Sequence, residues 1–189
     1  MFQAIIMESP VNIYFLALKE PFTEILASNK FNDVATEIVN AISKGELDTT
    51  SLDSILKAHG MEINAIKGEL LDIILAYINF VLDDDYITEK EADNVKFLKL
   101  LFKIKEGNFY KLKHGEVEKI LGRQFEHMYQ DNRINNEEAL QRVELQQLFD
   151  LGYDQFLHLS DKAVKAALAR GADPKNWMPL SGLVDRRVR

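Results

Sequence analysis

The sequence predicts an all-α fold built as a single helical bundle. Apolar residues recur at spacings of three and four along most of the 189 residues, which is the period of an amphipathic helix. Several of the 9 glycines and 4 prolines, such as Gly45, Gly107 and Gly171, fall between the periodic segments, where helices begin and end. With 47% hydrophobic residues, a chain of this length can bury one sizeable core.

We expect three parts in chain order. Residues 1–60 are predicted to form an N-terminal helical extension packed on the core, and residues 61–171 to form the bundle itself. Residues 172–189 have weak periodicity and are predicted to form an irregular C-terminal tail, docked by Trp177.

The first part is predicted to contain three helices. Ser9-Pro10 has the capping serine and first-turn proline typical of a helix start. Pro21 is expected to break or kink this helix, because proline lacks an N–H and clashes with the preceding turn. Further helices are predicted to begin near Phe31 and near Thr50, with a stop at Gly45 between them.

The central part carries the clearest helical pattern. A core helix is predicted from about Glu62 to Leu82, too short and too charged at its ends to span a membrane. The next helix is predicted to begin at Thr88 and to end before Gly107.

The remaining helices are predicted from the same periodicity. They comprise a segment from His114 to Tyr129, a long helix from Asn135 to about His158, and a short Ala-rich helix from Asp161 to Arg170. Gly171 is the natural residue to end the last of these.

Two segments of the chain match each other at an offset of 47 residues. Residues 84–91 align with residues 131–138, and three apolar residues that follow, Leu98, Leu101 and Phe102, align with Leu145, Leu148 and Phe149. The sequence therefore predicts two pseudo-repeated helix–loop–helix units. Two units are too few for a solenoid, so we expect them to pack face to face in one bundle.

Each unit contains an acidic turn followed by a helix-capping pattern. Thr88-x-x-Glu91 is a capping-box pattern, and Asn135-x-x-Glu138 is its asparagine counterpart. An EF-hand is excluded, because its first ligand positions would fall on Phe80 and His127 rather than on carboxylates.

The carboxylates around the first turn also form a candidate metal site. Asp83, Asp84 and Glu91 supply the oxygen ligands that Ca²⁺ or Mg²⁺ prefers. The alternative is that they only build a tight, capped helix connection, and the sequence leaves both interpretations open.

The pattern from Asp84 to Glu91 resembles the TerB-like domain of tellurite-resistance proteins, and the resemblance covers about residues 66–153. It implies an all-helical domain with internal symmetry that works in bacterial stress or phage-defence systems and is associated with divalent metal ions. It carries over a set of acidic positions as metal ligands: Asp83, Asp84 and Glu91, with Asp131 and Glu138 in the second unit.

Charge and composition narrow the classes of function. With 30 acidic against 23 basic residues, the net charge of -7 does not favour nucleic-acid binding. The absence of cysteine excludes disulfides, thiolate metal sites and a cysteine nucleophile. Residues 96–119 hold seven lysines, which either bind an acidic partner or form a solvated face. The N-terminal residues do not resemble a secretion signal, so we expect a cytoplasmic protein.

No catalytic signature is present in the sequence. The four histidines form no H-x-x-x-H pair, although His127 lies one turn before Asp131, and the common nucleotide-binding and hydrolase motifs are absent. We expect a non-enzymatic interaction module that binds a protein partner in a bacterial stress or defence system. The alternatives are an acidic immunity protein that masks a basic toxin or nuclease and, third, a metal-dependent hydrolase. The oligomeric state is left open.

Overall fold

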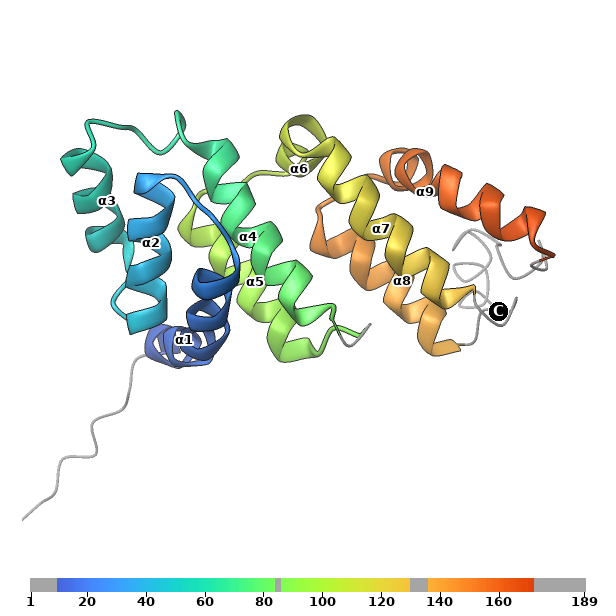
Figure 1. Cartoon of the computed structure of the whole chain (residues 1–189), viewed down its shortest axis with the longest axis horizontal. Coiled ribbons are helices and arrows are strands. Elements are labelled where there is room, and N and C mark those ends of the chain that lie inside the picture. Colours follow the sequence, from blue (N-terminus) through green and yellow to red (C-terminus); the bar gives the residue numbers. More distant parts are fainter. Residues whose placement is uncertain (1–9, 84–85, 130–135, 172–189) are drawn as a thin grey trace, which may run out of the picture. The chain divides into compact units, whose positions relative to one another are not determined.

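The computed structural model describes residues 10–83, 86–129 and 136–171, and all regular structure within these ranges is helical (Figure 1). For residues 10–16 and 136–139 it describes the backbone alone. The helices of the described ranges are α1 (Pro10–Ser28), α2 (Asp33–Lys44), α3 (Thr49–Ala58), α4 (Lys67–Val81), α5 (Glu89–Leu101), α6 (Asn108–Leu112), α7 (His114–Met128), α8 (Asn136–Leu148) and α9 (Tyr153–Ala169). The prediction of an all-α protein is confirmed. Among these helices, none has both the length and the apolar character needed to cross a membrane.

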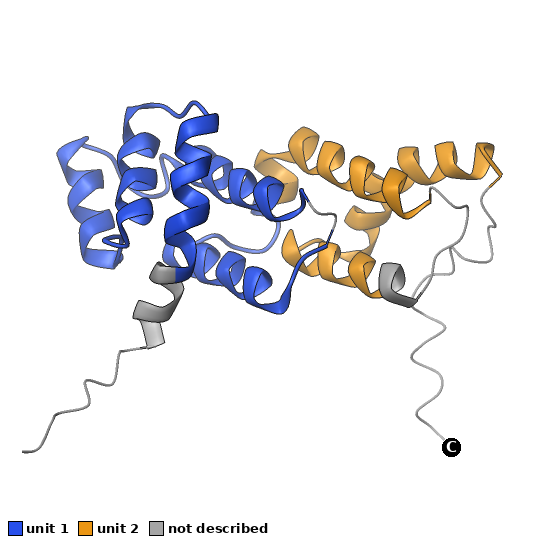
Figure 2. Ribbon diagram, turned by 60° about the horizontal axis from the view of Figure 1, so that its bottom comes forward, with its two compact units in different colours: residues 1–108 blue, residues 109–189 orange. Residues whose placement is uncertain are grey.

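The chain divides into two compact units, residues 1–108 and residues 109–189 (Figure 2). The first unit combines the predicted N-terminal extension, residues 1–60, with α4 and α5. The second contains α6 to α9. The predicted tail, residues 172–189, lies outside the described residues.

In the first unit, α1 packs against α2 and also contacts α4 and α5. Its fully buried residues Leu18, Phe22 and Ile25 lie on one stripe of the helix, and the ring of Phe22 stacks on Tyr77 of α4 at a centroid distance of 5.6 Å. Of the two predicted effects of Pro21, a break or a kink, the break does not occur, since α1 runs through the proline. Burial of the stripe on both sides of the proline offsets the hydrogen bond that proline cannot make.

Helices α2 and α3 begin and end with strong local signals. The Asn32 side chain accepts a hydrogen bond from the backbone N–H of Ala35 at 2.9 Å, and Gly45 ends α2 with a left-handed φ of 74°. Asp48 caps α3 by accepting from the Ser51 N–H at 2.7 Å. This backbone hydrogen bond and a second one from the Ser51 side chain hold the pKa of Asp48 below its usual value. The predicted stop at Gly45 is confirmed.

Each unit contains one helix pair, and the bounds of the two pairs are related by the same offset of 47 residues. The helix pair α4 and α5 occupies Lys67–Val81 and Glu89–Leu101, and the pair α7 and α8 occupies His114–Met128 and Asn136–Leu148. Two residues after the second helix of each pair ends, the chain has a left-handed residue other than glycine, Lys103 with φ 52° and Asp150 with φ 49°. The two helix pairs thus match in length and in the backbone geometry at their ends.

Each helix pair also contains one buried polar contact at the matching positions. In the first pair, Asn94 Nδ2 donates to the hydroxyl of Tyr77 at 2.8 Å. In the second, Gln141 Nε2 donates to Gln124 Oε1 at 3.0 Å. All four side chains are buried, so each hydrogen bond forms away from water, where a missing partner is costly.

Burial raises the pKa of Tyr77 to about 12, with a further rise from the charge of Glu91, whereas the hydrogen bond from Asn94 lowers it. Because the phenol ionises near pH 10 once the chain unfolds, the stability it provides is complete below pH 10 and declines as the pH rises toward 12. Between pH 9 and pH 11 we expect Tyr77 to account for a loss of about 1 kcal/mol.

The measurement is urea unfolding at both pH values, for the natural protein and for Tyr77→Phe. The variant, although less stable at both, is expected to have a flatter dependence on pH. Equal slopes for the two proteins would contradict the raised pKa.

The second unit differs most from the sequence prediction. The long helix expected from Asn135 to about His158 is wrong, because α8 ends at Leu148 and α9 begins at Tyr153. The N–H of Leu151 bonds to the Gln146 carbonyl at 3.0 Å and closes the end of α8. The predicted short helix from Asp161 to Arg170 is the second half of α9.

Aromatic rings form much of the core of the second unit. Helix α7 packs against α9, where Phe125 contacts Phe156 at a centroid distance of 5.8 Å. Phe109 of the short helix α6, which the sequence analysis did not predict, meets Phe149 edge-on at 5.5 Å. The guanidinium of Arg142 lies over the Phe125 ring at 5.6 Å, and burial lowers its pKa.

Candidate functional site

The structure describes the side chains of two of the five predicted metal ligands. Asp83 is exposed just after α4, and Glu91 is half-buried in the first turn of α5. Asp84 and Asp131 lie outside the described residues, as does the side chain of Glu138. Within the described ranges, no three His, Asp or Glu side chains form a group that could hold a metal ion. The acidic metal site therefore stays a prediction.

Glu91 forms a reciprocal cap with Thr88 at the start of α5. Its Oε2 accepts from the Thr88 N–H at 2.8 Å and from the Thr88 hydroxyl at 2.7 Å, while the Thr88 Oγ1 accepts from the Glu91 N–H at 3.3 Å. The predicted capping box is confirmed here. This carboxylate satisfies a backbone donor and places negative charge at the positive end of the helix.

Replacing Glu91 with alanine is therefore expected to lower the free energy of unfolding by about 1 kcal/mol, since the cap is lost. The loss should appear in full without added Ca²⁺, because the cap needs no metal ion. Glu91→Gln retains an acceptor oxygen and should keep most of the stability. The measurement is urea unfolding of the three proteins in both buffers. A loss that appears only in the presence of Ca²⁺ would point to metal binding instead.

The acidic excess is concentrated in the first half of the chain. Residues 1–95 contain 17 acidic against 6 basic residues. Every acidic side chain from residue 17 to residue 66 is exposed, and these are Glu20, Glu24, Asp33, Glu37, Glu46, Asp48, Asp53 and Glu62. The first unit thus presents many carboxylates to solvent, against four lysines in the same range.

The lysine-rich stretch at residues 96–119 is not a uniform charged surface. Lys96 forms an ion pair with Asp93 at 2.8 Å, whereas Lys99 is buried. The stretch also spans the boundary between the two units. The ion pair of Lys96 and the burial of Lys99 favour a structural role for these two lysines of the stretch.

A lysine outside the stretch caps the end of α5. Lys67 Nζ donates to the carbonyl oxygens of Phe102 at 2.6 Å and Lys103 at 2.5 Å. Partial burial lowers the pKa of Lys67, and the charges of Lys103 and Lys105 lower it further. An ammonium at this position satisfies terminal carbonyls and balances the negative end of the helix dipole.

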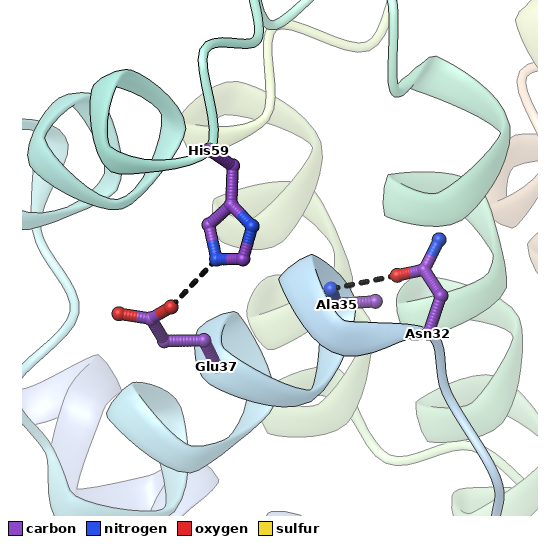
Figure 3. A network of polar contacts seen from close by, with 4 residues as sticks. All are labelled: Asn32, Ala35, Glu37 and His59. Atoms are coloured by element: carbon purple, nitrogen blue, oxygen red, sulfur yellow. Dashed lines mark hydrogen bonds and ion pairs between the residues drawn. The ribbon is translucent and has the colours of Figure 1, made fainter.

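His59 connects α3 to α2 in the first unit (Figure 3). Its Nε2 lies 2.8 Å from Glu37 Oε2, close to the start of α2 where Asn32 caps Ala35. The pair is partly exposed, so it contributes little to stability and joins the two helices at their surface.

Two histidines that the sequence analysis treated as isolated are brought together in the second unit. The rings of His114, at the start of α7, and His158, on α9, have centroids 5.6 Å apart. Tyr110 of α6 lies beside both, 5.0 Å from the His114 centroid, and its hydroxyl is 3.4 Å from His158 Nδ1. His127 is exposed, and Asp131, one turn after it in the sequence, is not among the described residues.

Comparison of the chain with protein-family models, with curated proteins and with solved structures finds no match.

Proposed function

We propose that this protein is a non-enzymatic interaction module of a bacterial stress or defence system, and that the acidic surface of its first unit binds a basic protein partner. The exposure of all eight acidic side chains between residues 17 and 66 is the observation that supports the proposal most directly. The bacterial setting rests on the resemblance to TerB-like domains, and a cytoplasmic location is part of the same proposal.

Exposed carboxylates at this density favour association with a positively charged surface. Opposite charges across an interface accelerate encounter and suppress wrong partners, and their effect weakens as salt is added. Glu20 and Glu24 suit a test, because both are exposed on α1 one helical turn apart and neither is part of a cap.

The experiment compares the natural protein with the charge-reversal variant Glu20→Lys/Glu24→Lys. Each is used to capture proteins from a lysate of the host cells, and the captured partner is then purified for binding measurements at two salt concentrations. We expect a basic partner whose affinity falls with salt and falls about tenfold in the variant.

The matched control is Glu126→Lys/Glu144→Lys, which makes the same change in net charge at exposed positions of the second unit. Affinity should change much less in this variant. Equal losses of affinity in both variants would show only an effect of net charge. An affinity that changes neither with charge reversal nor with salt would contradict the proposal.

An immunity or inhibitor function is the second candidate, since the same carboxylates suit the masking of a basic toxin or nuclease. It requires that the captured partner is toxic or nucleolytic and that adding this protein suppresses that activity. A partner with neither property would leave the general interaction module as the better proposal.

A divalent ion at the acidic turns is a separate part of the proposal. It is supported by the exposure of Asp83 and by the carboxylates beside it in sequence. Calorimetric titration with millimolar Ca²⁺ and Mg²⁺ tests it, with Asp83→Asn as the variant expected to weaken binding. The absence of heat for both ions would remove the metal from the proposal.

A further inference from the structure

We propose that His114 and His158 form a binding site for a divalent first-row transition metal ion such as Zn²⁺, with Tyr110 as a positioning residue. This site differs from the acidic turns in its ligands and in its place on the chain, and it does not depend on the proposed function.

The spacing of the two rings suits a shared metal ion. A tetrahedral ion about 2.0–2.1 Å from one nitrogen of each imidazole places the two ring centroids about 5 Å apart. The observed separation of 5.6 Å exceeds this by about half an ångström, so the side chains must move modestly for both rings to bind one ion. His114 is half-buried and His158 is exposed, which leaves the pair accessible to an ion from solvent.

Tyr110 determines which nitrogen of His158 faces the ion. Its hydroxyl lies 3.4 Å from Nδ1, and this contact leaves Nε2 as the ligand atom. A partner on the second ring nitrogen is the usual arrangement for histidines that bind metals, because it fixes the orientation of the ring. Tyr110 thus acts on the ion through His158.

The chemistry of the ligands selects the class of ion. Neutral imidazole suits Zn²⁺, Ni²⁺ and Cu²⁺, whereas Ca²⁺ and Mg²⁺ require oxygen ligands. Two protein ligands leave the remaining positions to water, so the site is open. Asp154 and Asp161 lie one turn before and one turn after His158 on α9, where their negative charges favour a cation. Asp161 is itself paired with Lys165 at 2.7 Å.

The test is calorimetric titration of the tag-free, full-length protein with ZnCl₂. We expect one Zn²⁺ per chain and a melting temperature that rises with Zn²⁺ concentration. His114→Ala and His158→Ala should each weaken binding by about tenfold or more, since each removes a ligand. Tyr110→Phe keeps the ring but removes the hydroxyl, and it should weaken binding by a smaller factor.

The controls are His59→Ala and His127→Ala, which remove the two other histidines and should leave Zn²⁺ binding unchanged. Circular dichroism of every variant without metal checks folding. If His114→Ala fails to fold, His158→Ala is sufficient for the test, because His158 is exposed. Zn²⁺ binding that is insensitive to His158→Ala, or that is lost in a control variant, would overturn the proposal. A Ca²⁺ titration of His158→Ala should match that of the natural protein, which separates this site from the acidic turns.

Discussion

Replacing Phe22 with alanine is expected to lower the free energy of unfolding of the first unit by about 3–5 kcal/mol. The Phe22 side chain has no exposed surface and stacks on Tyr77. Its removal therefore loses the free energy gained by burying a large ring and leaves a cavity between α1 and α4. The effect is large because this ring is the middle one of the three buried residues Leu18, Phe22 and Ile25 on α1.

Urea or thermal unfolding followed by circular dichroism measures the loss. Glu24→Ala, at an exposed position of the same helix, is the matched control and should change the stability by no more than about 0.5 kcal/mol. A loss below about 1 kcal/mol for Phe22→Ala would mean that α1 is not held on α4 through this ring.

Substitution of Asn94 by leucine is expected to cost about 1–3 kcal/mol, although leucine is larger and more apolar. The reason is that the hydroxyl of Tyr77 loses its donor while it remains buried. In the double variant Tyr77→Phe/Asn94→Leu both polar groups are gone, and most of the loss should be recovered. Unfolding free energies of the two single variants and the double variant form the required cycle.

The second helix pair provides an internal comparison for this cycle. Gln141→Leu removes the donor to the buried Gln124 Oε1, and Gln124→Leu/Gln141→Leu removes both side chains of this hydrogen bond. We expect the same pattern of loss and recovery there. Strictly additive effects in either pair would show that the two side chains are not energetically coupled.

The hydrophobic period predicted most helices, because helix formation is driven by burial of one apolar face. The break between α8 and α9 was missed although Gly152, the N-cap of α9, lies within it as a local signal. The chain turns there through Asp150 in a left-handed conformation, which aspartate tolerates better than most residues. At Pro21 the opposite occurred, since packing extended α1 through a residue that locally favours a helix end.

The candidate sites also differ in how far the sequence alone could predict them. The cap between Thr88 and Glu91 could be predicted, because it joins residues three apart and depends only on local backbone geometry. The contact between His114 and His158 joins residues on two helices, and no spacing in the sequence indicates it. It arises only when α7 packs against α9.

The two buried polar contacts also restrict how each helix pair can align. Apolar stripes repeat with every turn, so α5 could slide along α4 by one turn, about 5.4 Å, and still bury leucine against isoleucine. Such a shift would separate Asn94 from Tyr77 and leave both polar groups among hydrocarbon side chains. One amide thus sets the register of a helix pair whose hydrophobic residues alone would accept several alignments.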